Sequence, residues 1–141
     1  MTPKILIIGS TGKLGIKLLN FFNKKNINIF AITCFNNYKL LKRLSIKQKI
    51  KYSFKLSDHK EEINFKLFLK KNKFDIIYFL DYGYKSLSYI NIILNYNQNS
   101  SIAIANKEMI IAGGETLINK ISKTKNKLIP LDSEHFSLKN N

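Results

Sequence analysis

Short apolar runs alternate with amphipathic segments along the whole chain, and this alternation constrains the fold more than any other feature of the sequence. Six runs have the length and composition of strands: residues 4–9, 27–35, 49–56, 74–80, 100–106 and 127–131. Five segments between them carry apolar residues at helical spacing: residues 13–25, 38–48, 58–72, 84–96 and 107–122. Strands separated by helices form βαβ units with parallel strands and right-handed crossovers. The sequence therefore predicts one Rossmann-like, doubly wound α/β domain over residues 1–141, with a mainly parallel sheet and helices on both faces.

Composition limits the classes of protein to which this chain can belong. Hydrophobic residues make up 45% of its 141 residues, which is typical of a folded domain. The chain has one cysteine, no secretory signal pattern and no apolar run long enough to cross a bilayer, so we expect a cytoplasmic protein without a membrane partner.

The net charge of +15 has two interpretations. Lysines are scattered from Lys4 to Lys139, in a chain that is also rich in Asn, Ile, Tyr and Phe, and these are residues of A/T-rich codons. Genome composition then explains the charge, and we predict no nucleic-acid partner. The alternative is a nucleic-acid or anionic-surface binder, which steep salt dependence of DNA binding would reveal.

A glycine-punctuated turn follows the first predicted strand and opens the first predicted helix. In "IIGSTGKLG" the glycines are Gly9, Gly12 and Gly15. In a Rossmann turn one glycine allows the tight turn, one allows the backbone to approach a pyrophosphate, and one allows close packing of helix on strand. The alternative is a glycine-rich turn without a ligand. If a dinucleotide binds, NADP is favoured, because "AITCFNNYK" has no acid at the end of the second strand to bond a ribose 2′-hydroxyl.

Two further motifs lie at the ends of later strands. "ANKE" places Asn106, Lys107 and Glu108 between a strand and a helix, where ligands bind in open α/β sheets, although these residues also suit an ordinary helix start. "PLDSEH" places Asp132 and Glu134 on the same side of an extended backbone. Paired carboxylates favour a hard cation such as Mg²⁺ or Mn²⁺, but a polar turn capped by Asp132 fits equally well.

The three motifs in this order resemble the 1-deoxy-D-xylulose 5-phosphate reductoisomerase family. That resemblance implies NADPH-dependent rearrangement and reduction of a phosphosugar to 2-C-methyl-D-erythritol 4-phosphate in isoprenoid biosynthesis. It assigns cofactor contacts to Thr11, Gly12, Lys13, Leu14, Asn37, Asn106 and Glu108. It assigns substrate contacts to Lys107, Ser133 and Glu134, and divalent-metal ligands to Asp132 and Glu134.

The sequence also departs from the family pattern. The family turn reads GSTGSIG where this chain has Lys13 and Leu14, a Gly-Lys pair is replaced by Phe35 and Asn36, and the turn after the fourth strand keeps only Gly83. The resemblance further implies that the family's catalytic and C-terminal domains, with a third metal-binding Glu, are absent from these 141 residues. No catalytic set is then complete, and we expect a truncated form with weak or no activity alone, as a homodimer or with a complementing chain. The alternative is a non-catalytic dinucleotide-binding remnant or interaction module.

Overall fold

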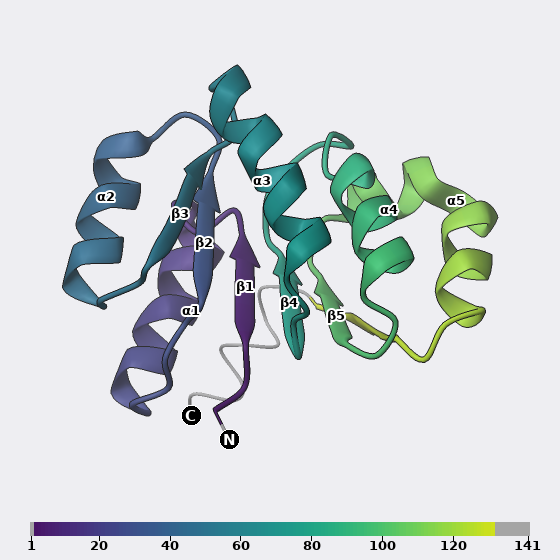
Figure 1. Cartoon of the computed structure of the whole chain (residues 1–141), viewed down its shortest axis with the longest axis horizontal. Helices are drawn as coiled ribbons and strands as arrows, with labels where there is room; N and C mark the ends of the chain where they lie inside the picture. Colours follow the sequence, from purple (N-terminus) through teal and green to yellow (C-terminus); the bar gives the residue numbers. More distant parts are fainter. Residues whose placement is uncertain (1, 132–141) are drawn as a thin grey trace.

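The structure is a computed structural model that describes residues 2–131, and within that range six strands form one parallel sheet. The strand order is β3-β2-β1-β4-β5-β6, and every neighbouring pair is parallel (Figure 1). The strands are β1 (Ile5–Ile8), β2 (Ala31–Cys34), β3 (Tyr52–Lys55), β4 (Ile76–Phe79), β5 (Ser101–Ile104) and β6 (Lys127–Pro130). The helices are α1 (Lys13–Lys24), α2 (Tyr38–Lys47), α3 (His59–Lys71), α4 (Leu87–Tyr96) and α5 (Lys107–Ser122). The predicted Rossmann-like, doubly wound fold is confirmed.

The central strand β1 shows why both faces of the sheet are covered. All four of its side chains are buried, and successive side chains in a strand point to opposite faces. Ile5 and Ile7 pack in a cluster with α1 and α2, whereas Leu6 and Ile8 pack in a cluster with α3, α4 and α5. A strand that is apolar on both faces requires helices on both faces, as parallel sheets generally do.

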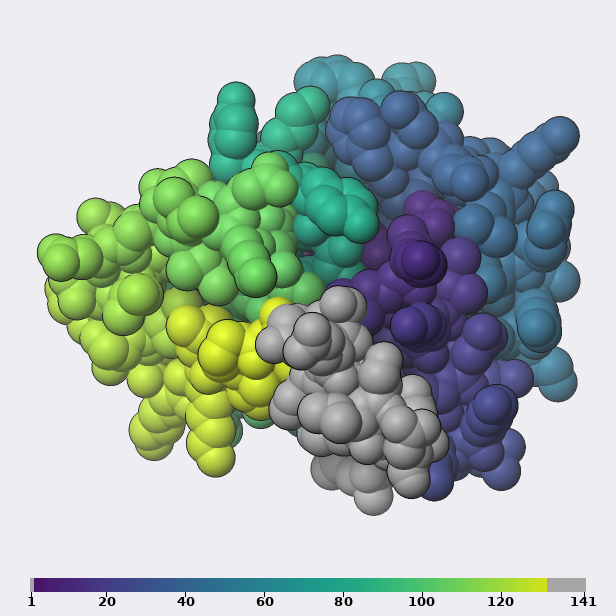
Figure 2. Space-filling model, turned by 180° about the vertical axis from the view of Figure 1, so that it is seen from behind, coloured from purple at the N-terminus to yellow at the C-terminus, as the bar shows by residue number. Residues whose placement is uncertain are grey.

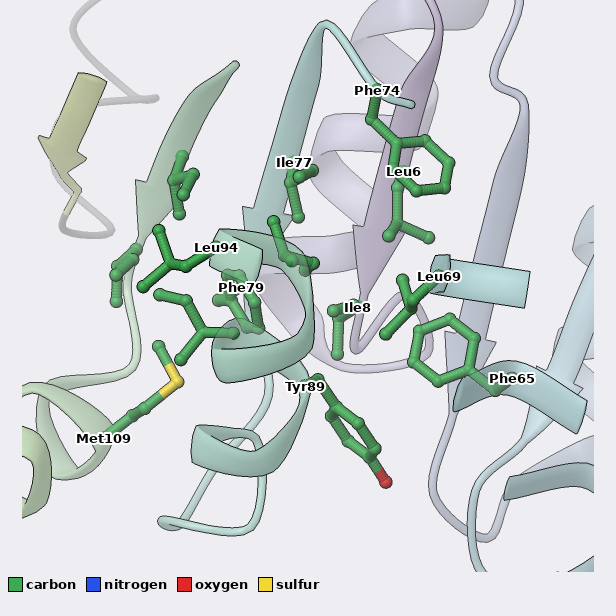
Figure 3. Close-up of a cluster of buried hydrophobic side chains, with 14 of the residues drawn as sticks. Leu6, Ile8, Phe65, Leu69, Phe74, Ile77, Phe79, Tyr89, Leu94 and Met109 are labelled. Carbon is green, nitrogen blue, oxygen red and sulfur yellow. The ribbon is translucent and has the colours of Figure 1, made fainter. Parts of the chain in front are cut away.

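The cluster on the α3–α5 face joins the two halves of the sheet. Figure 3 shows Leu6 and Ile8 of β1 beside Ile77 and Phe79 of β4, with Phe65 of α3 packed over the β1 side. All five side chains are fully buried. The chain passes to this face after β3, and α3 then leads back to β4, which lies beside β1. Seen from behind, the N-terminal half in purple and blue lies beside the C-terminal half in green and yellow (Figure 2).

Element ends follow local capping chemistry more closely than hydrophobic pattern. Asp58 caps α3 by accepting hydrogen bonds from the N–H groups of Lys60 (2.9 Å) and Glu61 (3.3 Å), which confirms the expected helix start. The helix predicted from residue 84 begins instead at Leu87, because residues 81–86 form the connection from β4. The last helix is kinked, since Gly114 has φ 54° and ψ −149° inside α5.

Buried amides hold the amino end of the sheet. Asn126, just before β6, accepts hydrogen bonds from the N–H (2.7 Å) and the hydroxyl (2.8 Å) of Ser100, and donates to the carbonyl of Asn97 (2.9 Å). Buried polar groups are stable only when bonded, so this cluster fixes where β6 joins β5. Beyond β6 the described part of the chain has no further strand.

In residues 2–131, no helix combines the length and the apolar character that a membrane span requires.

Candidate functional site

The strand order creates a crevice between β1 and β4. The connection after β1 leads to α1 on one face of the sheet, and the connection after β4 leads to α4 on the other face. The two connections therefore diverge at the carboxyl ends of these strands. In open α/β sheets, ligands bind at such a switch point.

Two glycines of the first turn are required by the packing of the protein itself. Gly9 has φ +88°, and a Cβ on it would lie 2.6 Å from the backbone nitrogen of Asp81. A Cβ on Gly15 would lie 2.5 Å from the carbonyl oxygen of Gly9 and 2.6 Å from the Cα of Ser10. Gly9 thus allows β1 to approach the end of β4, and Gly15 allows α1 to pack against the turn.

The remaining glycine of the turn has no such explanation. Gly12 has φ −81°, a conformation open to any residue, and a Cβ on it would meet nothing within 4 Å. It is the N-cap of α1, without a side-chain capping bond or an acid in the first turn. The open space at Gly12 leaves room for a ligand to approach the N–H groups at the start of α1.

Ser10 has a structural task rather than a ligand contact. It is fully buried, and its hydroxyl donates to the carbonyl of Thr33 at 2.8 Å. The hydroxyl oxygen of Thr33 accepts in turn from the N–H of Gly9 at 3.1 Å. These bonds tie the glycine turn to the end of β2 and hold its shape.

A first cavity of about 360 Å³ lies above β1, β2 and β4. Three of the sequence-predicted cofactor residues line it, namely Thr11, Gly12 and Asn37. Asn37 is also the N-cap of α2, where its side-chain oxygen accepts from the N–H of Leu40 at 3.2 Å. The structure therefore brings the turn after β1 and the end of β2 to one space.

A second cavity of about 460 Å³ lies between α1 and α5. The other predicted residues of the described chain line it: Lys13, Leu14, Asn106, Lys107 and Glu108. The two cavities share the wall formed by Leu80, Asp81 and Tyr82. Asp132, Ser133 and Glu134, the predicted metal and substrate residues, lie outside the described residues.

The Asn106 side chain is largely occupied by internal hydrogen bonds. Its oxygen accepts from the N–H of Met109 at 3.1 Å, which caps α5. Its amide nitrogen donates to the carbonyl of Gly83 at 2.7 Å and lies 3.4 Å from a carboxylate oxygen of Asp81. The predicted helix-start role of Asn106 is thus present, and the residue also fixes the connection after β4 against α5.

Asp81 is the site residue that sequence reasoning missed. It lies two residues after the end of β4, in the wall that the two cavities share, and its carboxylate accepts from the hydroxyl of Ser86. Burial raises the pKa of Asp81, with nearby Glu108 acting in the same direction, while the bonds from Ser86 and Asn106 oppose the shift. The sequence did contain a signal for this residue, because Asp81 is an acid directly after the strand predicted over residues 74–80.

Two further ionisable groups line the first cavity without being poised for chemistry. Burial raises the pKa of the Cys34 thiol to about 11, so this residue stays a neutral thiol near neutral pH. The Tyr89 hydroxyl donates to Glu62 at 2.5 Å. Burial, and to a smaller extent that hydrogen bond, raises the pKa of Tyr89.

The fold and the crevice define a Rossmann-like α/β domain with an open, glycine-lined switch point. Comparison with known proteins narrows this class. The chain is 32% identical, over 156 aligned residues, to the 1-deoxy-D-xylulose 5-phosphate reductoisomerase of Pelagibacter ubique. That alignment covers 96% of this chain and 39% of the relative.

Solved structures share the fold of this chain. The reductoisomerase from Zymomonas mobilis in complex with NADPH superimposes with a TM-score of 0.77 at 21% identity, covering 96% of this chain and 40% of that one. A reductoisomerase in complex with NADPH, fosmidomycin and magnesium has a TM-score of 0.77 at 21% identity, covering 94% and 37%. No family model matches the chain. The predicted resemblance is confirmed: the chain is homologous to a part of 1-deoxy-D-xylulose 5-phosphate reductoisomerases, and it spans about 39% of the length of its first curated relative.

Proposed function

We propose that this chain binds NADPH across the β1–β4 crevice as the nucleotide-binding part of a 1-deoxy-D-xylulose 5-phosphate reductoisomerase. The observation that carries the proposal is Gly12, whose missing side chain serves no packing need in this protein. In such a turn the backbone meets the pyrophosphate, and the free N–H groups and dipole of the helix start favour its negative charge. Thr11, Lys13 and Leu14 then lie beside the cofactor.

The proposed preference for NADPH over NADH rests on the lack of a negatively charged side chain directly after β2. Phe35, Asn36 and Asn37 follow β2 where an NAD-specific site carries a carboxylate. A carboxylate would repel a 2′-phosphate, whereas these residues leave room for one. Bound NADPH would supply the hydride for reduction. The residues of this chain would hold and orient the cofactor, with Asn106 and Glu108 at the second cavity.

The substrate and metal assignments concern the carboxyl ends of β5 and β6. We propose that Lys107, which lines the second cavity, contacts an anionic phosphosugar together with Ser133 and Glu134. Asp132 and Glu134 would bind Mg²⁺ or Mn²⁺, in agreement with the preference of these ions for carboxylate oxygens. Among residues 2–131 no three side chains of the metal-ligating types are grouped, so the metal proposal depends on this pair.

Nucleotide binding and turnover should separate in this chain. The curated relatives are longer proteins, and this chain spans about 39% of the length of the first of them. We propose that the chain alone binds NADPH with weak or no turnover, and that activity requires a complementing chain or a second copy. The alternative is a non-catalytic dinucleotide-binding module. We also propose that the protein acts in the cytoplasm.

A charge-reversal pair on α1 tests the binding proposal. Lys13 stands at the first turn of α1 beside the glycine turn, whereas Lys24 stands in the last turn of the same helix. Both side chains are exposed, so Lys13→Glu and Lys24→Glu change the net charge equally at opposite ends. NADPH titration followed by nucleotide fluorescence should show clear weakening for Lys13→Glu and little change for Lys24→Glu. Equal affinity in the two variants would refute the proposed location.

A second measurement addresses turnover. NADPH consumption should be followed with 1-deoxy-D-xylulose 5-phosphate and Mg²⁺ or Mn²⁺, first with the chain alone. Turnover comparable to that of a full-length relative would refute the proposal that the chain is weak alone. Activity that appears only on adding the remaining part of a relative as a separate chain would support complementation over the non-catalytic module.

A further inference from the structure

We infer that Lys85 and Phe35 together select the adenosine 2′-phosphate end of the cofactor, with Lys85 binding the phosphate and Phe35 stacking on the adenine. The inference rests on the proposed NADPH function and assigns residues that the family resemblance does not. Phe35 follows β2, and Lys85 lies in the connection between β4 and α4. Both line the first cavity, together with Thr11 and Gly12 of the glycine turn.

Phe35 is placed as a stacking surface. It follows four buried residues of β2, yet half of its own surface (50%) is exposed. An aromatic ring in this position gains little from the core of the domain. A flat base can cover such a ring, and base–aromatic stacking does not depend on which base is present.

Lys85 is held at the same ring. Its Nζ lies 4.8 Å from the centroid of Phe35, which joins the connection after β4 to the end of β2. The one ion pair found within residues 2–131 joins Lys66 to Glu62, so Lys85 has no carboxylate partner in that range. The ammonium group is therefore available to an anion that binds beside the ring.

The charges around Lys85 favour an anionic ligand. The residues that follow β2 carry no acid, and the only carboxylate among those lining the first cavity is Asp81. The Asp81 oxygens accept hydrogen bonds from Ser86 and Asn106 rather than pairing with Lys85. Lys85 thus supplies a cation at the 2′-phosphate end in a chain that has Asn36, and no lysine, directly after Phe35.

Two nucleotides that differ only in the 2′-phosphate test this assignment. Calorimetric titration should compare adenosine 2′,5′-bisphosphate with adenosine 5′-monophosphate. We expect the unaltered chain to prefer the bisphosphate, and Lys85→Gln to reduce that preference by about tenfold, as loss of a charged hydrogen bond does. Phe35→Leu should weaken both ligands by about fivefold or more, and should lower the preference for the bisphosphate less than Lys85→Gln does, because the ammonium group remains.

Lys73→Gln is the matched control, because Lys73 lies just before β4, at the opposite end of the sheet. It should bind both nucleotides like the unaltered chain. Lys39, in the first turn of α2, is the other lysine near the end of β2. Retention of the bisphosphate preference in Lys85→Gln, or its loss in Lys39→Gln instead, would overturn the role of Lys85. If the unaltered chain binds NADPH while Lys85→Gln has no effect, only this inference fails. If the unaltered chain binds neither NADPH nor the bisphosphate, the proposed function itself fails.

Discussion

The same substitution at two glycines three residues apart should affect different properties. Gly15→Ala should lower stability, because Gly15 is needed for packing, whereas Gly12→Ala should weaken NADPH binding, because Gly12 leaves space open. Gly15→Ala places a methyl group 2.5 Å from the Gly9 carbonyl oxygen and 2.6 and 2.7 Å from backbone atoms of Ser10. Forcing atoms into a packed region costs about 1–3 kcal/mol, occasionally more. Alanine in a helix regains about 0.5–1 kcal/mol relative to glycine. Because all three contacts are with backbone, we expect a net loss of about 2 kcal/mol.

Gly12→Ala should leave the free energy of unfolding nearly unchanged. The added methyl group meets nothing within 4 Å, and φ of −81° suits alanine. Restricting the unfolded chain contributes about 0.4–1 kcal/mol, which offsets a poorer N-cap of similar size. The methyl group would instead occupy the approach of the pyrophosphate, so we expect NADPH affinity to fall by about tenfold or more.

Urea unfolding followed by far-UV circular dichroism measures stability, and NADPH fluorescence titration measures binding. The reasoning is refuted if Gly15→Ala is as stable as the unaltered chain, because the turn would then yield without strain. It is also refuted if Gly12→Ala binds NADPH normally, because the open space would then serve no ligand.

Three further predictions concern buried groups. Asn126→Ala should lower the free energy of unfolding by about 1–3 kcal/mol in urea unfolding, since it leaves the N–H of Ser100 and the carbonyl of Asn97 unpaired; an unchanged midpoint would contradict this. The Cys34 thiol should resist alkylation by iodoacetamide at pH 8 until the protein unfolds, because it is buried and its pKa is about 11; rapid labelling of the folded chain would count against the structure. The raised pKa of Asp81 means that the folded state holds its proton more tightly than the unfolded state, so this group's contribution to stability falls as pH rises from about 4 through the folded pKa. Asp81→Asn should remove that slope from the pH dependence of urea unfolding, and an identical slope in both proteins would argue against it.

Much of the fold was predictable because it is encoded in local pattern. The apolar run that contains Ile5–Ile8 is buried on both faces, and the glycine turn that follows it starts a helix as expected. The ends of elements were less accurate. Residues 27–30 look as strand-like as Ala31–Cys34, but pairing with β1 begins only at Ala31. The start of that pairing cannot be read from the sequence, so the predicted strand was too long.

The candidate site was predictable only where motifs carry it. Thr11, Gly12 and Asn37 line one cavity as a family-like turn implies, whereas Asp81 and Lys85 became evident from the structure. Their importance depends on β4 lying beside β1, which is a contact between residues about seventy positions apart in the chain. Short-range periodicity contains no information about such pairing, so the acid after β4 could be seen in the sequence without its place in the crevice.

Pro130 has a consequence for how the sheet meets other molecules. The N–H groups of Lys127 and Leu131 bond to β5, so by the alternation of a strand the N–H groups of residues 128 and 130 point away from the sheet. Proline has no N–H, so β6 offers a single outward backbone donor, that of Leu128. A strand approaching this side would find an incomplete hydrogen-bonding template, and Lys127 adds a positive charge beside it. Among the described residues, β6 is one of two edge strands, with β3 at the other edge, and its outward side discourages edge-to-edge aggregation.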